Sequence, residues 1–245
     1  MKSVVEISDV WKKFPMRRDR PGFKEFLVNL PKFINGNSNS NFWAIKGVTF
    51  AVKQGECLGI IGKNGAGKST LLSLILGTIY PTKGNINVSQ EITPLLDIGA
   101  GFHPDLTGRE NILINGVLLG LTKDEVLKRI EEIITFSEIK EFVDMPVRTY
   151  STGMYLKLAF SVAINTNPKL LLIDEILSVG DEAFRKKSKD ALLQLIKGGV
   201  TTIFVSHNLT ALKEICNRAI WLDGGKIREE GIPEKVVEEY LKYSG

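Results

Sequence analysis

The feature that most constrains this chain is a glycine-rich segment at residues 62–70, which reads GKNGAGKST. It matches the pattern G-x-x-x-x-G-K-[ST], in which glycines let the backbone curl so that successive N–H groups point at one anion. A short apolar run, ECLGII, precedes the segment, and the helical pattern KSTLLSLIL continues from it. A strand, a curled loop and a helix N-terminus in direct succession predict a phosphate-binding site at the edge of an α/β sheet.

We expect this loop to hold the phosphates of ATP. Lys68 would reach the β- and γ-phosphates, and the hydroxyl group of Ser69 would bind Mg²⁺. The alternative, a glycine-rich turn without a ligand, does not explain why a strand and a helix flank the motif. The predicted nucleotide-binding residues of the loop are Gly62, Lys63, Asn64, Gly65, Ala66, Gly67, Lys68, Ser69 and Thr70.

Two further apolar runs, Leu170 to Ile173 (LLLI) and Thr201 to Val205 (TTIFV), have the same character as ECLGII. They are short, β-compatible and apolar on both faces, which is typical of buried parallel strands. The first leads into Asp174 and Glu175, and the second leads to His207. Because parallel sheets bind ligands at the carboxyl ends of their strands, we expect these side chains to lie at the same edge as the glycine-rich loop.

Each of these side chains has a chemical role that suits a nucleotide site. We expect Asp174 to hold Mg²⁺ and Glu175 to orient and deprotonate the attacking water. His207 would contact the γ-phosphate. Taken alone, an acidic strand end is as often structural as functional, and a strand-end histidine is more often structural. These assignments therefore depend on the glycine-rich loop nearby.

The 245 residues are enough for one large α/β domain, and their composition is that of an ordinary globular protein. We interpret residues 1–245 as a single nucleotide-binding domain, with a core formed by about 1–95 and 166–245. Residues about 100–165 have mainly helical patterns, which predict an inserted helical subdomain. Residues 15–43 contain three prolines and the tract NGNSNSN, and we interpret them as a loop insertion.

Composition argues against several other classes of protein. The net charge of +4 is mild and does not call for nucleic acid. Two cysteines and two histidines at these spacings do not form a metal cluster. No stretch reaches the ~18 uninterrupted apolar residues of a membrane span, and the N-terminus lacks the apolar core of a signal peptide. We therefore expect a protein on the cytosolic side, with any membrane part supplied by another chain.

Further segments resemble the ATP-binding cassette family. Tyr150 to Met154 (YSTGM) resembles the family's signature sequence, and Ser178 to Asp181 (SVGD) resembles its D-loop. Leu106 to Asn111 (LTGREN) resembles the run that opens the family's helical subdomain, and Phe14 stands where the family places an aromatic residue against adenine. The resemblance implies a P-loop NTPase (RecA-like) α/β core with an antiparallel β portion and an inserted α-helical subdomain.

The resemblance also implies a mechanism that needs two copies of the chain. The copies would enclose two ATP molecules head to tail, with the loop of one copy facing Ser151 and Gly153 of the other. Closure would do mechanical work, and hydrolysis through Glu175 and His207 would reset it.

The sequence departs from the family pattern in two places. Thr152 and Met154 replace the Gly and Gln of the usual signature. Asp97 stands near the position where the family has a glutamine after a strand.

One branch of the family is most similar, the ATP-binding subunits of polysaccharide exporters of the O-antigen, capsule and teichoic acid type. The similarity lies in Leu95 to Asn111, Tyr150 to Ala163, Ile173 to Phe184, and the insertion at 15–43. It implies an ATP-driven translocase subunit that works with an integral membrane subunit at the cytoplasmic face of the inner membrane. The insertion makes O-antigen the first choice of cargo. Another exporter of the branch, or a soluble cassette ATPase without a transport role, is the alternative.

The insertion has two interpretations. It can be a solvated variable loop, or a segment that meets an anionic head group or a lipid-linked polysaccharide. Arg17, Arg18 and Arg20, with nearby phenylalanines, favour the second interpretation.

Overall fold

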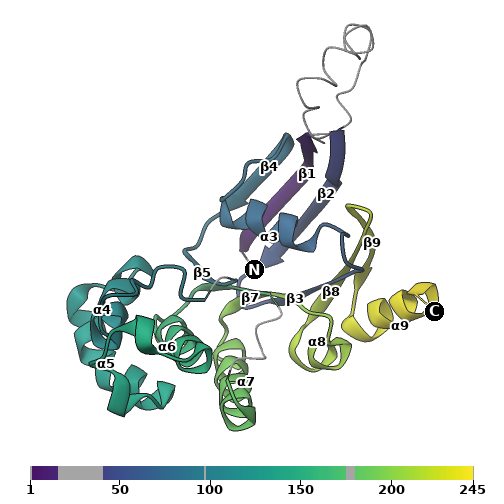
Figure 1. Ribbon diagram of the computed structural model, residues 1–245. Coiled ribbons are helices and arrows are strands. Elements are labelled where there is room, and N and C mark those ends of the chain that lie inside the picture. The colour runs from purple at the N-terminus through teal and green to yellow at the C-terminus, as the bar shows by residue number, and fades with distance from the viewer. Residues whose placement is uncertain (1, 16–40, 97, 175–179, 245) are drawn as a thin grey trace, which may run out of the picture.

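The strands form two sheets (Figure 1). The computed structural model describes residues 2–15, 41–96, 98–174 and 180–244. A three-stranded antiparallel sheet has the order β2-β1-β4, and a six-stranded sheet has the order β5-β6-β7-β3-β8-β9. Neighbours in the larger sheet are parallel, except β8 and β9. The strands are β1 (Ser3–Pro15), β2 (Asn41–Lys53), β3 (Cys57–Ile61), β4 (Lys83–Val88), β5 (Ile92–Leu95), β6 (Leu170–Asp174), β7 (Thr201–Val205), β8 (Arg218–Asp223) and β9 (Lys226–Gly231).

The helices cover both faces of the larger sheet (Figure 1). Helix α3 lies between the two sheets, and its Leu71, Leu72 and Ile75 belong to the apolar core shared with β1, β2 and β3. The helices are α3 (Lys68–Leu76), α4 (Gly108–Leu118), α5 (Lys123–Ser137), α6 (Thr152–Ile164), α7 (Glu182–Lys197), α8 (Leu209–Ile215) and α9 (Pro233–Ser244), with short 3-10 turns at Lys140–Phe142 and Val147–Thr149. Within the described part of the chain, no helix is both long and apolar enough to cross a membrane.

A separate apolar cluster joins α4, α5 and α6 at one side of the sheets (Figure 1). These helices lie within the residues 100–165 that the sequence predicted to be helical. Helix α5 begins with a capping box, which the sequence T-x-x-E at Thr122 to Glu125 favours: Thr122 Oγ1 accepts a hydrogen bond from Glu125 N (3.3 Å), and the Glu125 carboxylate accepts one from Thr122 N (2.7 Å). Apolar side chains at helical spacing along α5 are buried in the cluster: Val126, Ile130, Ile133 and Ile134.

Local sequence signals account for the turns and strands near both ends of the described chain. The two glycines Gly224 and Gly225 form the turn between β8 and β9, and α9 begins at Pro233. Strands β1 and β2 remain paired as far as Pro15 and Asn41. The segment between these strands is therefore 16–40, which is shorter at both ends than the insertion predicted at 15–43 and lies outside the described residues.

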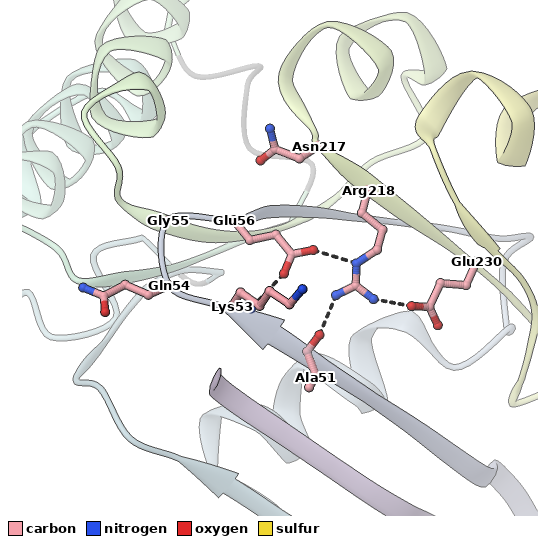
Figure 2. A pocket seen from close by; sticks show the side chains of 8 residues that line it. All are labelled: Ala51, Lys53, Gln54, Gly55, Glu56, Asn217, Arg218 and Glu230. Atoms are coloured by element: carbon pink, nitrogen blue, oxygen red, sulfur yellow. Dashed lines mark hydrogen bonds and ion pairs between the residues drawn. The ribbon is translucent and has the colours of Figure 1, made fainter. Parts of the chain in front are cut away.

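Arg218 ties the two sheets together near the amino ends of β3 and β8 (Figure 2). Its Nε donates to Glu56 Oε1 at 2.6 Å, its Nη1 bonds Glu230, and its Nη2 donates to the carbonyl of Ala51 on β2. The side chain of Glu56 is only 13% exposed. A half-buried carboxylate of this kind needs its partner, because burial removes the water that would otherwise solvate its charge.

We expect Arg218→Met to lower the free energy of unfolding by about 2 kcal/mol, since Glu56 would lose a charge-assisted hydrogen bond while remaining half-buried. Urea denaturation would measure the loss. As the control, Lys235→Met breaks an exposed ion pair with Glu229, which solvent screens, and should cost much less. Equal costs for the two variants would contradict this account.

Candidate functional site

Three strand ends converge at the carboxyl edge of the larger sheet. Strand β3 leads directly into the loop at 62–67, and its Ile60 lies opposite Val205 of β7. Val205 in turn lies opposite Asp174, the last residue of β6. The loop, Asp174 and the residues after β7 therefore emerge side by side, as the sequence predicted.

The loop curls around the ammonium group of Lys68. Lys68 Nζ donates to the carbonyl oxygen of Gly62 at 2.7 Å and to that of Lys63 at 3.1 Å, and the residue is only 8% exposed. The N-cap of α3 is Gly67, and neither a side-chain cap nor an acidic residue occupies the first turn of the helix. The first N–H groups of α3 and the positive end of its dipole are thus available to an anion.

Glycine is required where the loop touches neighbouring strands. A Cβ atom at Gly62 would lie 2.2 Å from the carbonyl oxygen of Leu222, and one at Gly67 would lie 2.6 Å from that of Ala44. The turn between β8 and β9 contacts the loop through its backbone, because Gly225 N donates to Ala66 O at 3.0 Å. The motif indicates the curl of the loop, but nothing in its local sequence indicates this contact with Gly225.

Most of the remaining predicted residues of the loop lie toward solvent. Lys63, Asn64, Gly65 and Ser69 are exposed, Thr70 is half-buried, and Ala66 is buried. A hydroxyl at Ser69 and a carboxylate at Asp174 are hard oxygen donors of the kind that Mg²⁺ prefers. Among the described residues, no three His, Cys, Asp or Glu side chains cluster as a metal site. The donor set thus suits a cation that binds phosphate oxygens and water besides the protein.

The loop after β7 presents His207 to solvent. Ser206 Oγ accepts a hydrogen bond from Asn208 N (3.0 Å), and Asn208 Oδ1 caps α8 by accepting one from Ala211 N (3.0 Å). His207 lies between these two anchored residues and is exposed. The prediction for Glu175 and the expectation for Asp97 fall outside the described residues.

Phe14 lies near the end of β1, opposite Phe42 of β2. Its side chain is half-exposed, and Lys12 Nζ lies 5.1 Å from its ring centroid while donating to Tyr80 O at 2.7 Å. An exposed ring held in place by a cation is a suitable stacking surface for a base, and the adenine contact of Phe14 stays a prediction.

The predicted signature residues lie in the helical group, away from the glycine-rich loop of the same chain (Figure 1). Ser151 is the N-cap of α6, and its Oγ accepts a hydrogen bond from Met154 N at 3.2 Å. Gly153 lies in the first turn of that helix and is half-buried. Both residues therefore stand at a second helix N-terminus, which suits an anion supplied from outside this chain.

A hollow of about 750 Å³ lies at the amino ends of β3 and β8, not at the loop (Figure 2). Its lining includes the Arg218 network described above. Two positive and two negative side chains balance there, namely Lys53, Arg218, Glu56 and Glu230. The hollow is therefore not the predicted nucleotide site.

Residues 45–178 match the model of the ABC transporter family. An O-antigen export system ATP-binding protein of Klebsiella pneumoniae is 44% identical over 98% of this chain and 98% of its own length. One from Myxococcus xanthus is 47% identical over 96% of this chain, which spans about half of that relative (54%). A teichoic acids export ATP-binding protein of Lactiplantibacillus plantarum is 40% identical over 98% of this chain and 65% of its own length.

The fold also matches solved structures. A dimeric ATP-binding cassette with bound ADP and phosphate superposes with a TM-score of 0.72 at 22% identity, over 94% of this chain and 98% of its own. An ATP-binding subunit of an ABC transporter superposes with a TM-score of 0.76 at 20% identity, over 97% of this chain and 93% of its own. At this identity the likeness shows the fold, which agrees with the P-loop NTPase core predicted from the sequence.

The two glycines that flank α3 provide a matched test of the loop. In Gly67→Ala the new Cβ must displace the loop from Ala44 O, and we expect the affinity for ATP to fall about tenfold or more, since each charge-assisted hydrogen bond contributes about 1.5–3 kcal/mol. Gly77→Ala has the same left-handed strain (φ +78°) but meets open space, so it should cost about 1 kcal/mol of stability and leave affinity unchanged. Calorimetric ATP titration and thermal unfolding would measure both, and equal affinities would refute the steric account.

Proposed function

The chain belongs to the ABC transporter family, and we propose that it is the ATP-hydrolysing subunit that drives export of a lipid-linked polysaccharide across the cytoplasmic membrane. The observation that carries the proposal is the similarity to the O-antigen export protein of K. pneumoniae over nearly the whole of both chains. O-antigen is therefore the first candidate cargo. Teichoic acid is the second, because a relative named for its export is 40% identical.

We assign a division of work to the predicted site residues, most of which belong to the carboxyl edge of the larger sheet. The N–H groups of the loop and Lys68 bind the phosphates, Ser69 and Asp174 hold Mg²⁺, and Phe14 stacks on adenine. Glu175 deprotonates the attacking water, and His207 contacts the γ-phosphate. Mg²⁺, when bound, neutralises charge that develops on the phosphate oxygens.

Ser151 and Gly153 complete the site of a second copy. They stand at the N-terminus of α6, where backbone N–H groups and the helix dipole favour a phosphate. A solved cassette with this fold is described as a dimer, which supports the same assembly here. Hydrolysis would then require two copies.

Glu175→Gln should lower the rate of hydrolysis by about 100-fold or more, because an amide cannot accept the proton of the attacking water. ATP would remain bound, and size-exclusion chromatography with ATP should show a stable dimer. Glu234→Gln, at an exposed carboxylate of α9, is the control and should behave as the wild type. Hydrolysis at the normal rate by Glu175→Gln would show that another group is the base.

An apolar stripe on α4 supports a partner on this side of the molecule. Ile114, Val117 and Leu118 follow helical spacing and are 40%, 46% and 68% exposed. Beside them lies a mainly apolar hollow of about 200 Å³, lined in part by Phe102 and Ala159. Clustered exposed apolar side chains mark interaction sites, and we assign this one to an integral membrane subunit that would hold the chain at the cytoplasmic face.

Deleting the gene in its host should abolish the surface polysaccharide and leave lipid-linked precursor inside the cell. Wild type should restore the polysaccharide, and Lys68→Met should not, because it loses the cation that binds the phosphates. Immunoblots of extracted glycan would report both. Unchanged surface glycan in the deletion strain would refute the export function.

The same strain can test the two proposed contact surfaces. Leu118→Glu should lose export and membrane recovery, since a buried charge at an interface is costly, whereas Leu127→Glu changes an exposed leucine of α5 and should keep both. Deleting residues 17–40 should abolish export while purified protein keeps its ATPase activity. Normal export by that deletion would show that the segment does not contact the polysaccharide.

A further inference from the structure

Lys157 joins three helices through one ammonium group. It lies on α6, and its side chain is only 14% exposed. Its Nζ lies 2.6 Å from Asp181 Oδ2, at the start of α7, and 2.9 Å from Glu138 Oε2, at the end of α5. The same group lies 5.1 Å from the ring centroid of Phe184. A cation shielded from water by an aromatic ring and two carboxylates interacts with them more strongly than an exposed ion pair does.

The contact between Lys157 and Asp181 lies at the N-terminus of α7. Asp181 is the N-cap of that helix, because its Oδ1 accepts a hydrogen bond from Phe184 N at 2.9 Å while Oδ2 binds Lys157. The hydrogen bond from Lys157, followed by that from Phe184, lowers the pKa of Asp181 to about 2. Gly180 leaves room for the lysine, since a Cβ there would lie 3.1 Å from Lys157 Cε. Asp181 thus stays ionised and bound on both of its oxygens.

Glu138 is the second acidic partner of Lys157, and it also binds Lys187. It ends α5 in a left-handed conformation, with φ +60°. Its other oxygen lies 3.1 Å from Lys187 Nζ of α7. The hydrogen bond from Lys157 is the main reason that the pKa of Glu138 is lowered. The C-terminal end of α5, the middle of α6 and the first turns of α7 are therefore bound to one another by charge.

Tyr155, two residues earlier on α6, binds a second loop of the carboxyl edge. Its hydroxyl group donates to Gly99 O at 2.5 Å, and its ring meets Phe102 edge-on at 5.2 Å. Gly99 follows β5, whereas Asp181 follows β6 by seven residues in the sequence, and β5 and β6 are neighbours. The helix that begins with Ser151 therefore contacts the chain beyond both strands.

We propose that Lys157 is a positioning residue of the ATPase cycle, which fixes the start of α7 to the signature helix α6. This inference rests on the proposed function. When a second copy presents ATP to Ser151 and Gly153, displacement of α6 is transmitted through Lys157 to Asp181, the residue that sets the start of α7 beside the carboxyl edge. Lys157 contacts Asp181, Glu138 and Phe184 and lies outside the glycine-rich loop, so its removal should slow hydrolysis without weakening the binding of ATP to a single chain.

The test compares Lys157→Met with Lys157→Arg and with a matched control. Lys189→Met is the matched control, because it breaks a different ion pair of α7. In that pair Lys189 Nζ lies 3.1 Å from Glu214 Oε2, about two helical turns after Asp181. We expect Lys157→Met to lower kcat about tenfold or more, because small displacements of catalytic geometry have large kinetic effects. The Kd for ATP, measured on dilute protein, should stay within about twofold of wild type. Lys157→Arg should recover most of the rate, and Lys189→Met should keep it.

A second variant distinguishes the loss of the Lys157–Asp181 contact from a folding defect. Asp181→Asn keeps an oxygen to cap α7 but gives up the charge that attracts Lys157, so it should fold and still lower kcat. A wild-type kcat in Lys157→Met or Asp181→Asn would overturn the inference, as would a loss of ATP affinity that accounts for the whole effect. If wild type hydrolyses ATP and only the Lys157 result fails, the proposed function stands. Absence of hydrolysis by the wild type would refute both.

Discussion

The glycine-rich loop at residues 62–70 depends on a backbone hydrogen bond from Gly225 N to Ala66 O, at 3.0 Å. The turn that carries Gly225 is itself held by Lys46 N of β2, which donates to Gly225 O at 2.8 Å. The loop, the β8–β9 turn and the antiparallel sheet thus meet backbone to backbone. A Cβ at either Gly67 or Gly225 would come within 2.6 Å of the carbonyl oxygen of Ala44. Glycine at both positions is the condition under which the two sheets can enclose an anion site.

The segments that leave the carboxyl edge are held by different forces, and this difference suits their different tasks. The phosphate loop is fixed by its own backbone and by the buried ammonium group of Lys68. The loop after β7 is fixed by hydrogen bonds that Ser206 and Asn208 make to backbone N–H groups nearby in the sequence, and these bonds leave His207 exposed. The start of α7 is fixed by Lys157, through a charge contact with another helix. The glycine-rich loop is thus held by contacts of its own residues, whereas the start of α7 is held by a residue of the helical group.

Much of the site could be predicted because its signals are local. A strand followed by G-x-x-x-x-G-K-[ST] forms its curl from neighbouring residues, and the ends of LLLI and TTIFV mark where buried strands stop. The β1–β2 connection was predicted less well, because proline and asparagine at residues 15 and 41 did not suggest strands that stay paired to Pro15 and Asn41. The sequence around Gly224 and Gly225 indicates a turn, but not its contact with Ala66. Lys157 and Arg218 were not predicted to have a role, since each acts through partners that lie far away in the sequence.

The sequence by itself determined the family to which this protein belongs, the glycine-rich loop between a strand and a helix, the acidic end of β6 at Asp174 and the capping residues of its helices. Each of these is encoded within a few residues, where backbone hydrogen bonding and side-chain type decide the outcome. Only the tertiary structure decided that Asp174 lies opposite Val205, that the β8–β9 turn supports the loop, and that Lys157 binds Asp181. Those contacts depend on how sheets and helices pack, because burial and close approach join residues whose local sequences contain no information about one another.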